Sequence, residues 1–142
     1  MSAIVIDASV AVKWFLPEPH RDKAEALLSD FLNQGLSLVA PDLLVAEVGN
    51  TLWKRSVKTG EISIGEAEES YLDFLNLRMP LESSASLAEH AFNLAQQERH
   101  PVYDTLYIVL ALDHSCELIT ADEILVNKLS GKFPQIRWLG SL

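Results

Sequence analysis

The sequence predicts a three-layer α/β/α sandwich around a central, mostly parallel, five-stranded sheet. Three observations support this fold class. Short runs rich in β-branched and other apolar residues alternate with longer runs whose apolar positions recur at helical spacing. The strands are separated by helical runs, which provide the crossovers that parallel strands require. The chain is 142 residues long and 49% hydrophobic, enough to bury a core of its own, so we expect a single domain over residues 1–142.

Turn and cap residues delimit the elements of the first half of the chain. Gly35 and Gly60 stand where a helix would end, because glycine readily adopts the left-handed backbone of a helix C-terminus. Ser63 and Glu66 have the spacing of a capping box, so a helix should begin there. The expected elements are a strand over residues 3–6, a helix from 19 to 35, a strand over 36–40, a helix over 42–59 and a helix over 63–75.

The second half of the chain continues the alternation. A short apolar run predicts a strand, and the serines that follow it are suited to cap the next helix. Pro101 fits the first turn of a helix, where its missing N–H would have no partner in any case. The expected elements are a strand over residues 79–81, a helix ending at 97, a helix over 103–112, a strand over 116–120, a helix over 123–129 and a strand over 136–139.

Charge and cysteine content restrict the function. The chain has 11 basic and 20 acidic residues, a net charge of −9, which argues against a passive nucleic-acid binder with a basic surface. An enzyme that reaches phosphates through cations is still allowed, since two divalent ions would raise the net charge from −9 to −5. The one cysteine, Cys116, excludes an intramolecular disulfide. No long apolar run or basic leader is present, so we expect a cytoplasmic protein without a membrane span.

Four acidic residues lie where acids are unusual. Asp7 and Asp122 follow expected strands, and ligands of open α/β sheets bind beyond the carboxyl ends of strands. Glu47 and Asp104 lie on expected helices among apolar neighbours. Buried carboxylates need a partner, yet no Lys or Arg is interleaved with these acids at helical or strand spacing. Clustered oxygen ligands without His or Cys are typical of Mg²⁺ or Mn²⁺ sites, which can support chemistry on phosphate esters.

Each of these acids also has a structural interpretation. Asp7 and Asp122 could be helix N-caps, and residues 120–123 fit a capping box. Glu47 could face solvent, and Asp104 could be a first-turn acid that favours the helix dipole. Spacing alone therefore does not separate a metal site from four unrelated acids.

The segments that contain the four acids resemble, in order, the four acidic motifs of the PIN domain. They are Val5–Val10 (VIDASV), Ala46–Leu52 (AEVGNTL), Tyr103–Tyr107 (YDTLY) and Leu118–Asp122 (LITAD). Each motif alone is common, whereas their joint order, in the expected strand and helix contexts, is fairly specific. The resemblance extends from the first strand to the last few residues. Within that family the chain looks most like the VapC-type ribonuclease toxins of prokaryotic toxin–antitoxin pairs.

The resemblance implies a role for each acid. Asp7 and Asp104 would be the principal ligands of Mg²⁺ or Mn²⁺. Glu47 and Asp122 would complete the catalytic pocket, by binding metal or by helping to deprotonate the attacking water. The implied activity is a divalent-metal-dependent endoribonuclease that hydrolyses RNA phosphodiesters. The family usually acts as a homodimer, and a cognate antitoxin protein silences it by covering the pocket.

Three further residues concern the same site. Ser9 matches a hydroxyl position that the family uses to support the site, and Asn50 matches a polar position about one turn after Glu47 on the same helix face. Glu123 follows Asp122 directly, so either residue could supply the fourth carboxylate. Asp122 is the better match to the Thr-x-Asp form of the motif.

Two other functions share parts of this pattern. A PIN-like chain could be a catalytically idle protein-binding scaffold, although the presence of all four acids argues against the loss of a metal site. A phosphoacceptor receiver-like domain also binds Mg²⁺ with acids at strand ends. That class would need an acidic doublet near the first strand and a lysine after the last strand, and neither is visible.

Basic and histidine side chains are assigned mostly structural roles. The segment 53–58 (WKRSVK) is either a guide for an RNA backbone or, the reading we favour for its lysines, a solvated helix end. Lys13 and Trp14 lie close after Asp7 and could flank the pocket or form a partner surface. The histidines lack metal-ligand spacing and are interpreted as surface or helix-end residues; they are His20, His90, His100 and His114.

Overall fold

A single parallel sheet organises the chain, as described for residues 2–142 in a computed structural model; Met1 lies outside the described residues. The strand order is β3-β2-β1-β4-β5, and all four neighbouring pairs are parallel. The strands are β1 (Ala3–Ile6), β2 (Ser37–Pro41), β3 (Leu81–Glu82), β4 (Glu117–Thr120) and β5 (Ile136–Trp138). The predicted α/β sandwich with a parallel five-stranded sheet is confirmed.

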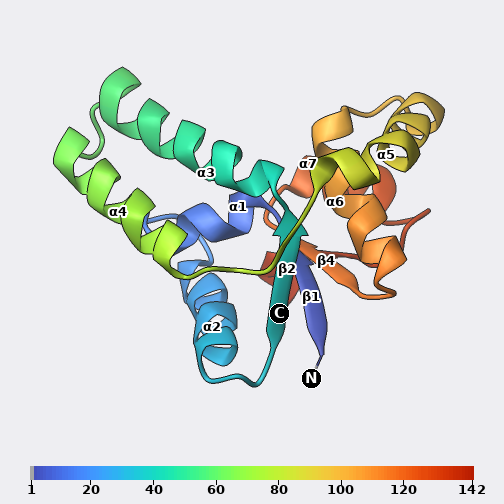
Figure 1. The fold of residues 1–142 in the computed structure, drawn as a ribbon, viewed down its shortest axis with the longest axis horizontal. Coiled ribbons are helices and arrows are strands. Elements are labelled where there is room, and N and C mark those ends of the chain that lie inside the picture. Colours follow the sequence, from blue (N-terminus) through green and yellow to red (C-terminus); the bar gives the residue numbers. More distant parts are fainter. Residues whose placement is uncertain (1) are drawn as a thin grey trace.

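Helices cover both faces of this sheet. In Figure 1, α1 to α4 lie on one side of the strands and α5 to α7 on the other. The helices are α1 (Ala8–Ala11), α2 (Arg21–Leu32), α3 (Leu43–Trp53), α4 (Ile64–Asn76), α5 (Ser84–Glu98), α6 (Val102–Asp113) and α7 (Glu123–Leu129). No helix within residues 2–142 combines the length and the apolar character needed to cross a bilayer.

The strand order creates a crevice beside β1. From β1 the chain crosses to β2 on one side, whereas β4, which pairs with β1 on the other side, leads away to β5. Adjacent strands that lead in opposite directions leave a gap at their carboxyl ends, which is where α/β sheets bind ligands. Because Ile6 pairs with Ile119, the residues that follow these two strands come together at that gap.

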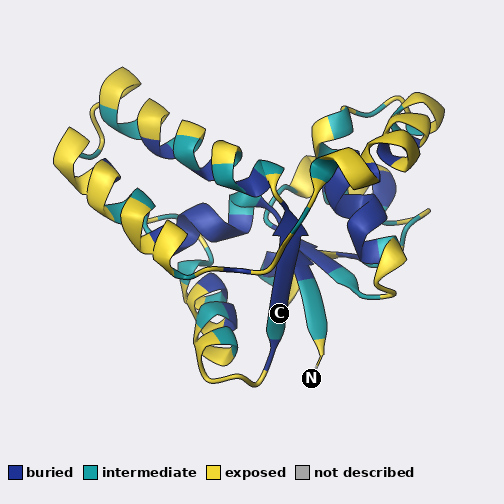
Figure 2. Ribbon diagram, in the orientation of Figure 1, coloured by how far each residue is buried: buried dark blue, intermediate teal, exposed yellow. Residues whose placement is uncertain are grey.

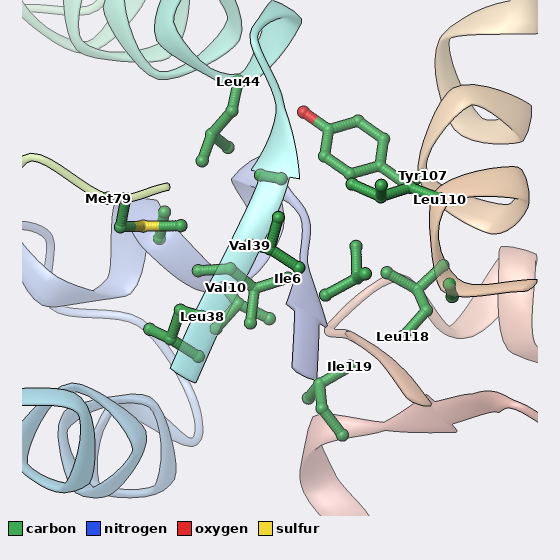
Figure 3. Packing of buried hydrophobic residues seen from close by; sticks show 14 of the residues in the cluster. Ile6, Val10, Leu38, Val39, Leu44, Met79, Tyr107, Leu110, Leu118 and Ile119 are labelled. Carbon is green, nitrogen blue, oxygen red and sulfur yellow. The ribbon is translucent and has the colours of Figure 1, made fainter. Parts of the chain in front are cut away.

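The core lies along β1, β2 and β4 and against α6. In α6 the run from Thr105 to Ala111 is buried on all sides, which is unusual for a helix and makes α6 the central helix of its layer. Figure 3 shows Tyr107 and Leu110 of this helix packed beside the strand residues. Figure 2 shows the contrast between the buried strands and the exposed outer faces of α4 and α5.

Helices α3 and α4 form an arm that projects from the sheet (Figure 1). The capping box predicted at Ser63 and Glu66 is present and begins α4. The Tyr71 hydroxyl of α4 donates a 2.7 Å hydrogen bond to the carbonyl of Val45 in α3. A Cβ at Gly49 would lie 2.9 Å from the Tyr71 ring, so glycine permits this close packing of the two helices.

Several predicted boundaries differ from the structure. The helix expected up to Gly35 ends at Leu32, and Gln34 rather than Gly35 has the left-handed backbone. The helix expected over 42–59 changes at Lys54 into a π-helical turn over Lys54–Lys58. A helix after Asp7 was anticipated only through the possible N-cap, and the 3₁₀ turn over Val12–Trp14 that follows α1 was not predicted. The third strand lies at 81–82 instead of 79–81, since it pairs only with the end of β2.

Candidate active site

The four acids come together at the crevice beyond β1 and β4. They line one cavity of about 160 Å³, together with Ala8, Ser9 and Tyr107; the acids are Asp7, Glu47, Asp104 and Asp122. Each comes from a different part of the fold: the end of β1, the middle of α3, the first turn of α6 and the start of α7. Residues separated by up to 115 positions therefore share one small, strongly acidic pocket.

Asp7 is the most buried of these acids, at 8% exposed. It occupies the position before α1, but its side chain makes no capping hydrogen bond, so the interpretation of Asp7 as a cap is wrong. Instead Oδ1 accepts from the Ser9 hydroxyl and Oδ2 from the Thr120 hydroxyl, both at 2.5 Å. Burial, together with a smaller effect of the nearby Asp104, raises the pKa of Asp7 to about 6, against the lowering effect of the two hydroxyls.

Glu47 is held by a tyrosine from the opposite side of the pocket. The Tyr107 hydroxyl donates a 2.6 Å hydrogen bond to Oε1 of Glu47. In Figure 3 this hydroxyl points away from α6 and toward α3. Partial burial raises the pKa of Glu47, the Tyr107 hydrogen bond lowers it, and the charge of Asp104 raises it. The alternative in which Glu47 simply faces solvent is therefore wrong.

Asp104 shares one face of α6 with Tyr107, one turn further on. Its Oδ2 lies 2.6 Å from Nε2 of His100, and Nδ1 of that ring lies 3.0 Å from Nζ of Lys128. The His100 side chain is only 8% exposed. The interpretation of His100 as a surface or helix-end residue is correct for its position, between the end of α5 and the start of α6, but its ring is not a surface group: it contacts one of the four acids directly.

Asp122 combines a structural role with its place in the pocket. Its Oδ1 accepts from the backbone amides of Ile124 and Leu125 and caps α7, as the structural interpretation expected. The predicted capping box over residues 120–123 is wrong, because Asp122 itself, and not Thr120, is the N-cap. Glu123 is exposed and does not line the cavity, so Asp122 is the fourth acid of this pocket.

A pair of hydroxyls joins the two strand ends at the pocket. Thr120, fully buried at the end of β4, donates to Asp7 and accepts from the amide of Asp122. Ser9 donates to Asp7 and accepts from the amide of Ala121. Sequence reasoning placed Ser9 but missed Thr120 and Tyr107. The available signal for Thr120 was a threonine that directly follows the apolar pair Leu118 and Ile119 at the end of a strand.

Most basic side chains near the pocket are engaged elsewhere. Arg55 is paired with Glu18 and with Glu61, and Glu18 also accepts from the buried Lys13. These contacts tie the arm to the loop after α1 and leave the Arg55 guanidinium occupied, against its use as an RNA guide. Trp14 is buried and donates to the carbonyl of Ala24, so it belongs to the core.

A wider cavity of about 410 Å³ adjoins the acidic pocket. Glu47 lines both cavities, and the other lining residues come from α3 and the start of α6; they are Leu43, Ala46, Asn50 and Tyr103. Asn50 is exposed here, one turn from Glu47, as its place on the helix predicted. The acidic pocket therefore opens sideways into a larger, partly apolar hollow.

The donor set suits a hard divalent cation. All four acids offer oxygen, and Asp7 is a buried carboxyl whose only side-chain partners within residues 2–142 are neutral hydroxyls. Such a group must bind either a proton or a cation. Within the same residues, no three His, Cys, Asp or Glu side chains are already arranged to hold a metal ion. Coordination by three of these acids would therefore require their side chains to move inward.

Comparisons with known proteins place the fold. No curated protein sequence matches the chain significantly. PAE2754 from Pyrobaculum aerophilum has a similar structure, with a TM-score of 0.71 and 21% identity over 99% of this chain and 92% of that one. VapBC2 from Rickettsia felis, solved with a DNA fragment from their promoter, matches with a TM-score of 0.59 and 15% identity over 96% of each chain. The family model of the PIN domain matches residues 4–129, and the chain therefore belongs to the PIN domain family.

Proposed function

We propose that this chain is a divalent-metal-dependent endoribonuclease. The single observation that carries the proposal is the convergence of four carboxylates from four separate elements on one cavity at the carboxyl edge of a parallel sheet. Membership of the PIN domain family supports nuclease activity in general. The choice of RNA as the substrate rests on the resemblance of the motifs to VapC-type ribonucleases.

Asp7 and Asp104 would be the principal ligands of Mg²⁺ or Mn²⁺, with Asp122 completing the site through the oxygen that does not cap α7. When bound, the cation would lower the pKa of a water molecule and offset the charge of the scissile phosphate. Asp7 accepts two hydroxyl hydrogen bonds, which hold both of its oxygens in place before any ion arrives.

Glu47 is the best candidate for the proton acceptor. Efficient general bases have pKa values near the working pH. The pKa of Glu47 is raised, so it lies closer to neutral pH than the pKa of an exposed glutamate. The Tyr107 hydroxyl fixes Oε1 and leaves Oε2 to accept the proton of the attacking water. A bond then forms between that water oxygen and phosphorus while the bond to the 3′ oxygen breaks, and the 3′ oxygen takes a proton from solvent. The products carry a 5′-phosphate and a 3′-hydroxyl.

The experiment is cleavage of a short single-stranded RNA by the purified chain with Mg²⁺ or Mn²⁺. EDTA and the Asp104→Asn variant are run alongside. We expect cleavage in the presence of metal and none in either control. Cleavage that persists in EDTA would contradict the metal requirement, whereas cleavage that persists in Asp104→Asn would point to a contaminating nuclease.

We also propose that the chain is the toxin of a toxin–antitoxin pair, acting as a homodimer in the cytoplasm. A structural neighbour named above belongs to the VapBC2 complex of Rickettsia felis, which supports this context. Induced expression of the chain alone should arrest bacterial growth, and the Asp104→Asn variant should not. Equal arrest by both proteins would exclude RNA cleavage as the cause.

A further inference from the structure

A chain of three side chains leads from the pocket to the surface, and the proposed reaction does not use it. His100 lies in the link between α5 and α6, Asp104 in the first turn of α6 and Lys128 in the last turn of α7. Nε2 of His100 is 2.6 Å from Oδ2 of Asp104, and Nδ1 is 3.0 Å from Nζ of Lys128. At 8% exposure, the imidazole is enclosed between its two partners.

The chemistry of lysine fixes the proton on this ring. A lysine ammonium has three N–H donors and no acceptor, so Nδ1 of His100 must be the acceptor of the bond to Lys128. Nε2 then carries a proton and donates to Oδ2 of Asp104. The ring therefore orients this carboxylate through Nε2.

This contact gives the two carboxylate oxygens of Asp104 different environments. Oδ2 is held by His100, whereas Oδ1 makes no hydrogen bond to any of residues 2–142. A carboxylate that is already oriented by one oxygen loses less side-chain freedom when the other oxygen binds an ion. Hydrogen bonds to the far side of metal ligands commonly strengthen metal binding by one to two orders of magnitude.

Lys128 also connects the relay, the chain of contacts formed by Asp104, His100 and Lys128, to the helix of the fourth acid. Its Nζ donates a second, 2.7 Å hydrogen bond to the carbonyl of Arg99, the C-cap residue of α5. Lys128 stands in the last turn of α7, and Asp122 is the N-cap of the same helix. One short helix therefore carries Asp122 at its start and, near its end, the side chain that contacts Nδ1 of His100.

We propose that His100 is a positioning residue for Asp104, which it contacts through Nε2 while its Nδ1 faces the ammonium of Lys128. Its role is to hold one oxygen of Asp104 so that the other is available to a divalent cation. The tautomer and the contact with Lys128 stand on the hydrogen bonds alone. The effect on the cation rests on the proposed function.

The tautomer is tested first, in the full-length protein without metal. Long-range ¹H–¹⁵N spectra at neutral pH distinguish a protonated from an unprotonated ring nitrogen in each histidine. For His100 we expect a proton on Nε2 and none on Nδ1. In Lys128→Met, an exchange at an exposed position, the proton should stay on Nε2, because Asp104 still accepts from it, and the ¹⁵N signal of Nδ1 should shift because its donor is lost. A wild-type ring protonated on Nδ1, or an Nδ1 signal unchanged in Lys128→Met, would overturn the relay and leave the proposed function standing.

The effect on metal binding is tested by calorimetric titration with Mn²⁺ alone. Removing the donor in His100→Leu should weaken Mn²⁺ binding by about 10- to 100-fold, whereas His100→Gln, whose amide can still donate, should stay within about 3-fold of wild type. The matched control is His90→Leu, at an exposed histidine on α5 that lies 3.9 Å from Asp113, an acid outside the pocket; it should leave affinity unchanged.

The outcomes separate the two proposals. If His100→Leu fails to fold, Lys128→Met and His100→Gln still report on the relay through the tautomer spectra and the titration. Equal Mn²⁺ affinity in wild type and in a folded His100→Leu would overturn the positioning role alone. A wild-type chain that binds no Mn²⁺ would overturn the metal-dependent function, and the role of His100 toward the cation with it.

Discussion

The hydroxyl of Thr120 donates a 2.5 Å hydrogen bond to Oδ2 of Asp7, across 113 positions of sequence. The contact exists because β1 and β4 are parallel neighbours, with Ile6 opposite Ile119, so that both strands end at the same point. It holds a buried carboxylate in a place where like charges repel it, which is a costly arrangement unless something else binds there. Asp7 is consequently the residue at which stability and function are most directly opposed.

The first prediction concerns the opposite effects of the Asp7 carboxylate on stability and on cleavage. Asp7→Asn should abolish cleavage, because a principal ligand is lost. At pH 8 without metal, the free energy of unfolding of this variant should be about 1–3 kcal/mol higher than that of wild type. The gain arises because a buried charge beside Asp104 is removed. Urea unfolding followed by circular dichroism gives the free energy. An Asp7→Asn protein that is unfolded would mean that the carboxylate is structural.

The second prediction is the pH dependence of the metal-free protein. Asp7 has a pKa of about 6 in the folded chain and an ordinary value of 3.8, so the folded state binds the proton more tightly. The free energy of unfolding should therefore rise as the pH falls from about 6 to 3.8, by about 3 kcal/mol from this group alone. The measurement is the difference between wild type and Asp7→Asn across this range. A difference that does not change with pH would contradict the raised pKa.

The third prediction concerns Tyr107, a buried side chain whose hydroxyl contacts Glu47. Tyr107→Phe removes one donor to a carboxylate, which should lower kcat by roughly 10- to 100-fold and destabilise the fold by only about 1 kcal/mol. Tyr71→Phe is the matched control, since it also removes a hydroxyl that bonds to α3, at the carbonyl of Val45. Its kcat should be unchanged. Equal kcat values in all three proteins would exclude a role for the Tyr107 hydrogen bond.

The fourth prediction is stabilisation by metal. A ligand at 100 times its Kd adds about 2.7 kcal/mol to the free energy of unfolding. For a chain of this length that corresponds to a rise in Tm of roughly 8 °C, which EDTA should reverse. Asp104→Asn should show a much smaller rise. A wild-type Tm that does not respond to Mg²⁺ or Mn²⁺ would favour the catalytically idle scaffold.

Much of this fold could be predicted because its signals are local. Ser63 and Glu66 form their capping box within four residues, and the strand of residues 3–6 is a single apolar run. The π-helical turn at Lys54 could not be read from the sequence. It coincides with ion pairs from Arg55 to Glu18 and Glu61, which depend on how the arm lies against the loop after α1.

Some residues of the site could likewise be predicted from the sequence, and others could not. Asp7 and Asp122 could be placed because each follows a strand, and the parallel sheet brings such ends together. His100 could not, since its partner Lys128 lies 28 positions further on and meets it only through the packing of α7. A histidine just before a proline at a helix start carries no periodic signal. Contacts of this kind depend on the tertiary fold and not on spacing.

The chemistry of the RNA ends tests the central claim most directly. A single-stranded RNA is cleaved with Mn²⁺, and the products are identified by mass spectrometry, with Asp104→Asn and EDTA reactions as blanks. If four carboxylates direct a metal-assisted attack by water, the fragments carry 5′-phosphate and 3′-hydroxyl ends and are missing from both blanks. Fragments that carry 2′,3′-cyclic phosphates would mean that the RNA's own 2′-hydroxyl is the nucleophile, and would contradict the account.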